Sequence, residues 1–368
     1  MEQENVSKKI KVSEVRPNCI LARDVVTKTG VVILAKNTMI NSVNFTKIEQ
    51  NDINYIYVWE DSIDNTLPAF NQNEVYTVEE QTKSVVDKPE FKEFDKTYGD
   101  NLNATKEILS SVGNAKTIDK AKLFAITNDI MEKVNCKSDI FTYLSYLKDV
   151  NDYTYSHSLN VSLLCNMFSK WLNLSEEERE DLTIAGFLHD IGKLKVDQNI
   201  LNKKGKLTDE EFEEIKKHPR LGYEMIKDTD ISDSIKEAIL MHHEKINGKG
   251  YPSGLKSDNI SKYAKIVSIC DIYDAMTSDR AYRGRLCPFQ VIRNFERQNF
   301  SILDTQYLLV FLQNIAYTYV GSWVKLTDGT VAEVVFINQG QMSRPIVKAE
   351  SGFIDLSKNL SLDIENLV

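Results

Sequence analysis

All five histidines of this chain fall between residues 157 and 243, and aspartates lie beside them or shortly after them. Histidine is the commonest metal ligand in proteins, and carboxylates complete many metal sites. A chain that places its whole histidine content in this way is most simply building a metal centre. The candidate ligands are His157, His189, Asp190, His218, His242, His243 and Asp271.

These seven candidate ligands exceed the needs of one ion, because zinc sites in proteins almost always have four ligands. Two ions that share a bridging aspartate would use all of them. Paired ions about 3.5–4 Å apart hydrolyse phosphate esters by stabilising the attacking and the leaving oxygen. No cysteine is among the candidates, which favours iron or manganese over a structural zinc. The pattern therefore predicts two divalent ions and phosphoester chemistry.

Each histidine taken singly is more often an ordinary core or surface residue than a metal ligand. The adjacent His242 and His243 raise a further objection, because neighbours on an ideal helix point about 100° apart. The combined pattern still favours a metal centre. His189 and Asp190 follow an apolar helical run and precede Gly192, a signal for the end of a helix. Side chains converge more easily at helix ends than along an apolar helix face.

Helices are the elements expected to position these ligands. Apolar residues recur at helical spacing from about Pro89 to Ala316. Ser175 with Glu178 and Thr208 with Glu211 form capping boxes, which predict that helices begin directly after Ser175 and Thr208. Asp271 and Asp274 are three residues apart, so they share one helix face.

The expected fold class is mainly α, with a small module on each side of the helical domain. Residues 1–62 have short β-rich runs and one amphipathic stretch, which indicate a small α/β module. Residues 63–88 are polar and are expected to be a linker. The helical domain is expected over residues 89–318. Residues 319–368 alternate strand-like runs with turns, which predicts a small β module.

The bulk composition limits the class of protein. Hydrophobic residues make up 42% of the 368 and charged residues 27%, as in ordinary soluble proteins. The net charge of −9 argues against binding to polymeric nucleic acid or to a membrane surface. No apolar run approaches the roughly 20 residues of a membrane span, and the charged N-terminus shows no signal peptide. Five scattered cysteines suit a reducing compartment. A cytoplasmic protein is expected.

Four short motifs occur in a fixed order along the helical region. They are His189-Asp190-Ile-Gly-Lys193, His218-Pro219, His242-His243-Glu244 and Gly250-Tyr251-Pro252, and a run from Asp271 to Arg283 follows them. Over roughly residues 90–318 the chain resembles the HD-GYP family, the branch of the HD superfamily that hydrolyses cyclic dinucleotides. The resemblance implies an HD-superfamily helical bundle as the catalytic domain.

The resemblance also implies a role for each matching residue. One ion would be bound by His157, His189, Asp190 and Asp271. The other would be bound by His218, His242 and His243, with Asp190 bridging the two. Lys193 would contact the scissile phosphate, and Arg280, Arg283 and Tyr251 would bind substrate. Asp274 would donate a proton to the leaving oxygen or orient a water.

Three features qualify this picture. Some family members have a glutamate four residues before the first histidine, where it supports a third ion. Tyr153 stands at that position here and supplies no carboxylate, so two ions are expected. Glu244 has two open interpretations: it orients a metal-binding imidazole, or it is a solvated carboxylate at a helix end. The Gly-Tyr-Pro motif alone indicates only a turn, and its place shortly after His242 and His243 is what makes it a candidate wall of the substrate site.

The leading hypothesis is a phosphodiesterase that opens cyclic di-GMP to pGpG by attack of a metal-bridging hydroxide, with further hydrolysis to GMP left open. A second hypothesis is hydrolysis of another cyclic dinucleotide, such as cyclic GMP-AMP. A third is a receptor that binds a cyclic dinucleotide without turnover. For the two end modules, regulation, homodimer formation, partner binding and simple packing all remain open.

Overall fold

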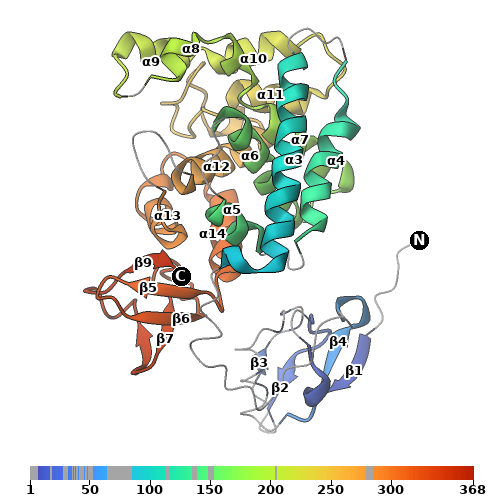
Figure 1. Ribbon diagram of the computed structural model, residues 1–368, viewed down its shortest axis with the longest axis vertical. Helices are drawn as coiled ribbons and strands as arrows, with labels where there is room; N and C mark the ends of the chain where they lie inside the picture. The colour runs from blue at the N-terminus through green and yellow to red at the C-terminus, as the bar shows by residue number, and fades with distance from the viewer. Residues whose placement is uncertain are drawn as a thin grey trace.

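Figure 1 shows the computed structural model of the chain, a body of helices with a strand-rich unit near each end of the sequence. The mainly α fold class expected from the sequence is confirmed. The structure describes residues 7–16, 19–27, 32–34, 36, 38, 40, 45, 48, 53–63, 85–112, 117–134, 139–147, 153–203, 205–278 and 285–368.

The N-terminal unit contains two antiparallel strand pairs among its described residues. β1 (Ser7–Lys11) pairs with β4 (Tyr55–Trp59), and β2 (Val25–Val26) pairs with β3 (Val32–Leu34). Its buried residues form a small hydrophobic core of their own. Most of the amphipathic stretch between β3 and β4 lies outside the described residues, as does most of the linker expected over residues 63–88.

The helical body begins with α3 and runs to α14 (Figure 1). Its helices are α3 (Pro89–Val112), α4 (Lys120–Glu132), α5 (Asp139–Tyr146), α6 (Tyr153–Trp171), α7 (Glu176–Leu188), α8 (Gln198–Leu201), α9 (Asp209–Ile215), α10 (His218–Ile226), α11 (Asp233–Met241), α12 (Lys262–Thr277), α13 (Pro288–Asn294) and α14 (Thr305–Thr318). A 3-10 turn over Ile191–Lys195 follows α7, and a π-helical turn over Phe295–Asn299 follows α13.

Two helices form the centre of this body. α6 is buried on every side from His157 to Ser169, and most of α12 is buried as well. A helix that is buried all round belongs to the core of its domain. α6 packs against α7, α12 and α3. The first candidate ligand, His157, and the last, Asp271, therefore lie on the two most enclosed helices.

The capping boxes predicted from the sequence are both present. The Ser175 hydroxyl accepts from Glu178 N while the Glu178 carboxylate accepts from Ser175 N, and Thr208 and Glu211 make the same reciprocal pair. These caps satisfy backbone donors that the first turn of a helix leaves unpaired. They fix where α7 and α9 begin, and α7 then ends immediately before His189.

The C-terminal strands form one five-stranded antiparallel sheet in the order β8-β7-β6-β5-β9. They are β5 (Trp323–Leu326), β6 (Val331–Phe336), β7 (Ile346–Ala349), β8 (Gly352–Asp355) and β9 (Ile364–Leu367). Buried residues of the sheet belong to the same hydrophobic core as the helices. Arg293 of α13 also donates to Asp363, at 2.8 Å from Nη1 to Oδ2. The sheet is thus packed onto the helical body.

Among the described residues, no helix combines the length and the apolar character needed to cross a bilayer.

Candidate metal centre

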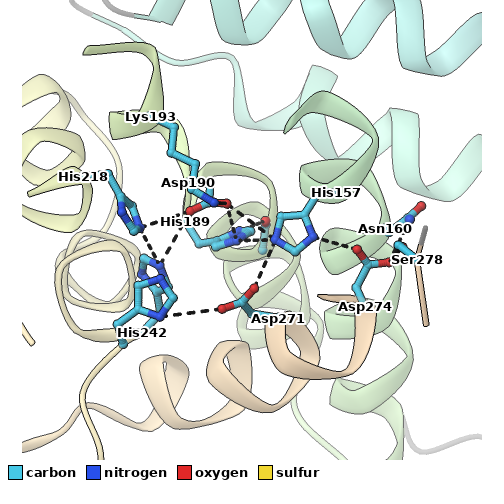
Figure 2. Close-up of polar contacts among 12 residues, drawn as sticks. His157, Asn160, His189, Asp190, Lys193, His218, His242, Asp271, Asp274 and Ser278 are labelled. Carbon is cyan, nitrogen blue, oxygen red and sulfur yellow. Dashed lines mark hydrogen bonds and ion pairs between the residues drawn. The ribbon is translucent and has the colours of Figure 1, made fainter. Parts of the chain in front are cut away.

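The candidate ligands come together from the ends and the interior of five helices, as Figure 2 shows for six of them. They form two groups, and within each group the ligand atoms lie within 4.8 Å of one another. One group is Asp190, His218, His242 and His243, and the other is His157, His189 and Asp271. All except His243 are buried. That these groups bind ions stays a prediction.

Asp190 lies between the two groups. Its Oδ2 is 3.5 Å from His157 Nε2 and 3.3 Å from His189 Nε2. Its Oδ1 is 3.2 Å from His218 Nε2 and 3.9 Å from His242 Nε2. The carboxylate is thus surrounded by four imidazoles, and each of its oxygens faces a different pair.

Three of these imidazoles are oriented by their own local backbone. The Nδ1 atoms of His189, His218 and His242 lie 2.8–2.9 Å from carbonyl oxygens three residues earlier. A carbonyl only accepts, so each Nδ1 carries the hydrogen and each Nε2 keeps a free lone pair. Those Nε2 atoms are the ones that face Asp190. Metal-binding histidines in proteins are usually fixed in this way.

Two close contacts between nitrogens test whether the site fits a cation. His157 Nε2 lies 3.2 Å from His189 Nε2, and His218 Nε2 lies 3.3 Å from His242 Nε2. His157 Nδ1 is bound to the carboxylate of Asp274, so its Nε2 also points inward. Lone pairs that face each other at this distance repel unless a cation or a proton lies between them. Asp190 Oδ1, moreover, is buried without a hydrogen bond partner. The residues therefore fit bound metal.

His242 and His243 both reach the cluster, so the objection from the helix angle was wrong. α11 ends at Met241, and the two histidines lie beyond its regular turns. Their ring centroids are 4.1 Å apart. His243 is the most exposed of the candidates, with a quarter of its side chain accessible (25%), and its Nδ1 lies 3.8 Å from Asp271 Oδ2.

The local charges keep both aspartates ionised. Burial alone would raise the pKa of Asp190, but Lys193 and the surrounding imidazoles hold it well below the usual range. The pKa of Asp271 is lowered in the same way, against burial, by His157 and His243. Burial also lowers the pKa of His157, but hydrogen bonds to Asp271 and Asp274 outweigh it and raise the value to about 9. The centre therefore attracts positive charge.

Gly192 allows two segments of the ligand set to approach each other. A Cβ atom at this position would lie 1.9 Å from the carbonyl oxygen of His218 and 2.5 Å from the backbone nitrogen of Gly222. Only a glycine permits this contact. The turn after Asp190 thus lies directly on the first turn of α10, and this brings His218 to Asp190.

Lys193 and Asp274, which the sequence singled out as catalytic, lie at the edges of the cluster. Lys193 Nζ forms a short ion pair with Asp190, and a fifth of its side chain is exposed (20%). Asp274 Oδ2 is 2.7 Å from His157 Nδ1, and its Oδ1 accepts from Asn160 and Ser278. Both oxygens of Asp274 are engaged on the outer side of His157 (Figure 2). This placement favours orienting His157 over the acid or water-orienting role expected from the sequence.

Tyr251 lies against the cluster through His243. Their ring centroids are 4.7 Å apart with an interplanar angle of 32°. The loop is held by Glu244, whose oxygens accept from Ser253 N at 2.7 Å and from Leu255 N at 2.9 Å. Neither interpretation of Glu244 from the sequence was right: it is buried and binds the loop backbone. A Cβ on Gly250 would lie 2.4 Å from Glu244 Cα, so this position also requires glycine.

Two expected substrate-binding residues, Arg280 and Arg283, lie outside the described residues. Sequence reasoning missed two residues that the structure brings close to the centre, Asn160 and Tyr98. Asn160 follows His157 by three positions, and this helical spacing could have suggested it. Tyr98 gives no such signal, because it lies far from the motifs in the sequence.

Comparisons with known proteins find relatives in sequence and in fold. Residues 142–306 match the family model described as HD domain. The chain is 35% identical over 234 residues to a cyclic di-GMP phosphodiesterase of Pseudomonas aeruginosa. This match covers 63% of this chain and 56% of that protein. The chain is 34% identical over 174 residues to 3'3'-cGAMP-specific phosphodiesterase 1 of Vibrio cholerae. This match covers 46% of this chain and 39% of that protein.

The match to a cyclic di-GMP phosphodiesterase of Borreliella burgdorferi is 30% identical and covers 53% of this chain and 52% of that protein. The chain thus spans about half the length of each of these two cyclic di-GMP phosphodiesterases. Among solved structures, an HDG"Y"P protein from Bdellovibrio bacteriovorus superposes with a TM-score of 0.51 at 16% identity. That match covers 83% of this chain and 98% of the other, and it indicates a shared fold.

Proposed function

We propose that the chain, whose residues 142–306 match the HD domain family model, is a metal-dependent phosphodiesterase that opens cyclic di-GMP to linear pGpG. The observation that carries this proposal is the buried set of four imidazoles around Asp190. The names of the Pseudomonas and Borreliella relatives support the choice of substrate.

We propose two ions, with iron or manganese as the metal. His157, His189 and Asp271 would hold one ion, His218, His242 and His243 the other, and Asp190 would bridge them. Imidazole and carboxylate ligands without thiolate suit iron or manganese. When bound, such ions would activate a water for attack on phosphorus and would stabilise charge on the phosphoryl oxygens.

The other residues would bind and orient the substrate. The Lys193 ammonium is partly exposed beside Asp190, so it is available to a phosphate oxygen, where a charge-assisted hydrogen bond would be strong. Arg280 and Arg283 are proposed to bind phosphate from their places in the sequence. Tyr251, with its ring against His243, would form a wall of the site. We propose that Asp274 acts by holding the His157 ring.

A second substrate is supported by the Vibrio cholerae relative, whose name specifies 3'3'-cGAMP. The hydrolysis of either cyclic dinucleotide needs the same metal ligands, so the cluster does not separate them. The choice would depend on contacts to the bases.

The wider organisation is also a proposal. We divide the chain into an N-terminal module over residues 1–62, a linker over 63–88, the catalytic domain over 89–318 and a β module over 319–368. The separate core of the first module supports its independence. The shared core of the last one supports a role as part of the catalytic body. A cytoplasmic location and a homodimer remain compatible with this division.

The test is turnover by metal-loaded protein. Purified protein reconstituted with Mn²⁺, or with Fe²⁺ under anaerobic conditions, is incubated separately with cyclic di-GMP and with 3'3'-cGAMP, and the linear products are followed by chromatography. We expect pGpG from cyclic di-GMP at the higher kcat/KM. A higher kcat/KM for 3'3'-cGAMP would reassign the substrate. Binding of cyclic di-GMP without any product with either metal would favour the receptor.

A further inference from the structure

The hydrogen bonds that hold His157 continue beyond Asp274 to another helix. Asn160 Nδ2 donates to Asp274 Oδ1 at 2.8 Å, and the Tyr98 hydroxyl donates to Asn160 Oδ1 at 2.7 Å. Figure 2 shows Asn160 beside Asp274, on the side away from His157. Tyr98 comes from α3, which packs on α6. The result is a chain of side chains that runs from α3 to His157.

The hydrogen bonds in this row of side chains have one consistent direction from donor to acceptor. His157 Nδ1 lies against a carboxylate, which only accepts, so it carries a hydrogen, and Nε2 is the nitrogen that faces Asp190 and Asp271. The Asn160 amide must present its NH₂ group to the same carboxylate. Its oxygen then faces Tyr98, whose hydroxyl must donate. A flipped Asn160 amide would place an oxygen against Asp274 and an NH₂ group against Tyr98.

Every side chain in this row of hydrogen bonds is buried. Tyr98 is 2% exposed, Asn160 7% and Asp274 3%. Burial and the nearby charge of Asp274 raise the pKa of Tyr98 well above its ordinary value, so the phenol keeps its proton. Hydrogen bonds in such surroundings polarise one another, and a missing partner is costly because water cannot replace it.

We propose that Tyr98 is a positioning residue for the metal centre: through Asn160 and Asp274 it fixes the ring orientation and tautomer of His157. This inference rests on the proposed metal-binding function. It also extends the functional unit, because Tyr98 lies outside the matched HD domain over residues 142–306. α3 would therefore contribute to metal affinity without contributing a ligand.

The test compares two phenol deletions. Tyr98→Phe removes the donor to Asn160 and keeps the ring. Tyr319→Phe is the matched control, because Tyr319 is also buried and its hydroxyl bonds to another phenol, that of Tyr273, at 3.2 Å. Metal-free protein of each variant is titrated with Mn²⁺ by calorimetry, and thermal unfolding of the metal-free proteins is recorded in parallel.

We expect Tyr98→Phe to weaken Mn²⁺ binding about three- to tenfold, less than the 10–100-fold typical of a group that contacts a ligand directly. Tyr319→Phe should bind Mn²⁺ like the wild type, although it should lose about as much thermal stability as Tyr98→Phe. In an Asn160→Ala background, Tyr98→Phe should weaken binding no further, because its path to His157 is already cut.

Equal Mn²⁺ affinity for Tyr98→Phe and Tyr319→Phe would overturn the inference and leave the metal centre intact. An additive loss in the double variant would show that Tyr98 does not act through Asn160, and would also overturn it. Absence of Mn²⁺ binding by the wild type would instead overturn the proposed function together with this inference.

Discussion

The backbone of Gly192 lies directly on the backbone of His218: a single added carbon at Gly192 would stand 1.9 Å from the His218 carbonyl oxygen. This contact joins the turn after Asp190 to the start of α10. It brings the two halves of the ligand set together, since Asp190 belongs to one segment and His218 to the other.

Substituting Gly192 should therefore damage both stability and metal content. Gly192→Ala forces two backbone segments apart, and overpacking of this kind costs about 1–3 kcal/mol or more. Gly99→Ala is the matched control, because nothing lies within 4 Å of the added Cβ in α3 and alanine is the better helix former by about 1 kcal/mol. Thermal unfolding and elemental analysis check this. A Gly192→Ala protein with wild-type melting temperature and metal content would contradict the contact.

Removing the carboxylate of Asp190 should empty the centre. Asp190→Ala leaves four imidazoles facing one another without the central anion, so both ions should be lost together with turnover. Asp190→Asn keeps the shape and removes the charge, and it should also lose most of the metal. Elemental analysis of the purified variants measures this directly. Retention of both metal and activity by Asp190→Ala would rule out a bridging role.

Glu244 should affect substrate binding more than metal binding. Glu244→Ala leaves Ser253 N and Leu255 N without their acceptor, and hydrogen bonds to a charged group contribute about 1.5–3 kcal/mol each. The loop that carries Tyr251 would loosen, so KM should rise severalfold while metal content stays at the wild-type level. Glu237→Ala, at an exposed position of α11, is the control. Metal loss in Glu244→Ala with an unchanged KM would contradict this assignment.

Chelation should lower the melting temperature of the helical body. A ligand that binds only the folded state stabilises it by about 2.7 kcal/mol at one hundred times its dissociation constant. Treatment with EDTA should therefore lower the melting temperature by several degrees, and added Mn²⁺ should restore it. Scanning calorimetry of treated and reconstituted samples measures the shift. An identical melting temperature in both samples would argue against metal bound to the folded chain.

Local signals predicted the parts of this molecule that local interactions form. The capping boxes at Ser175 and Thr208 lie within single turns of helix, so the sequence alone was enough to place the starts of α7 and α9. The mainly α class followed from apolar spacing in the same way. The convergence of His242 and His243 was harder to foresee, because it depends on where α11 ends.

Contacts between distant segments were beyond such reasoning. Glu244 accepts from backbone groups nine and eleven residues away, across a loop whose path the sequence does not reveal. Asn160 is bonded to Asp274, 114 residues further along the chain, and to Tyr98, 62 residues before it. The partners of Asp274 could not be read from the sequence for the same reason, since they are set by the packing of α12 on α6.

The way the imidazoles are held has an evolutionary consequence. His189, His218 and His242 each take their orientation from a carbonyl of their own segment, so none depends on a neighbouring ligand for its pose. A descendant that lost one of them would leave the backbone hydrogen bonds that orient the others in place. For the proposed function, stepwise decay from a hydrolase to a sensor of the same nucleotide without turnover is therefore open to this architecture. His157 differs, because its orientation depends on side chains of α12 and α3. Substitutions far from His157 in the sequence could therefore also start such a loss of activity.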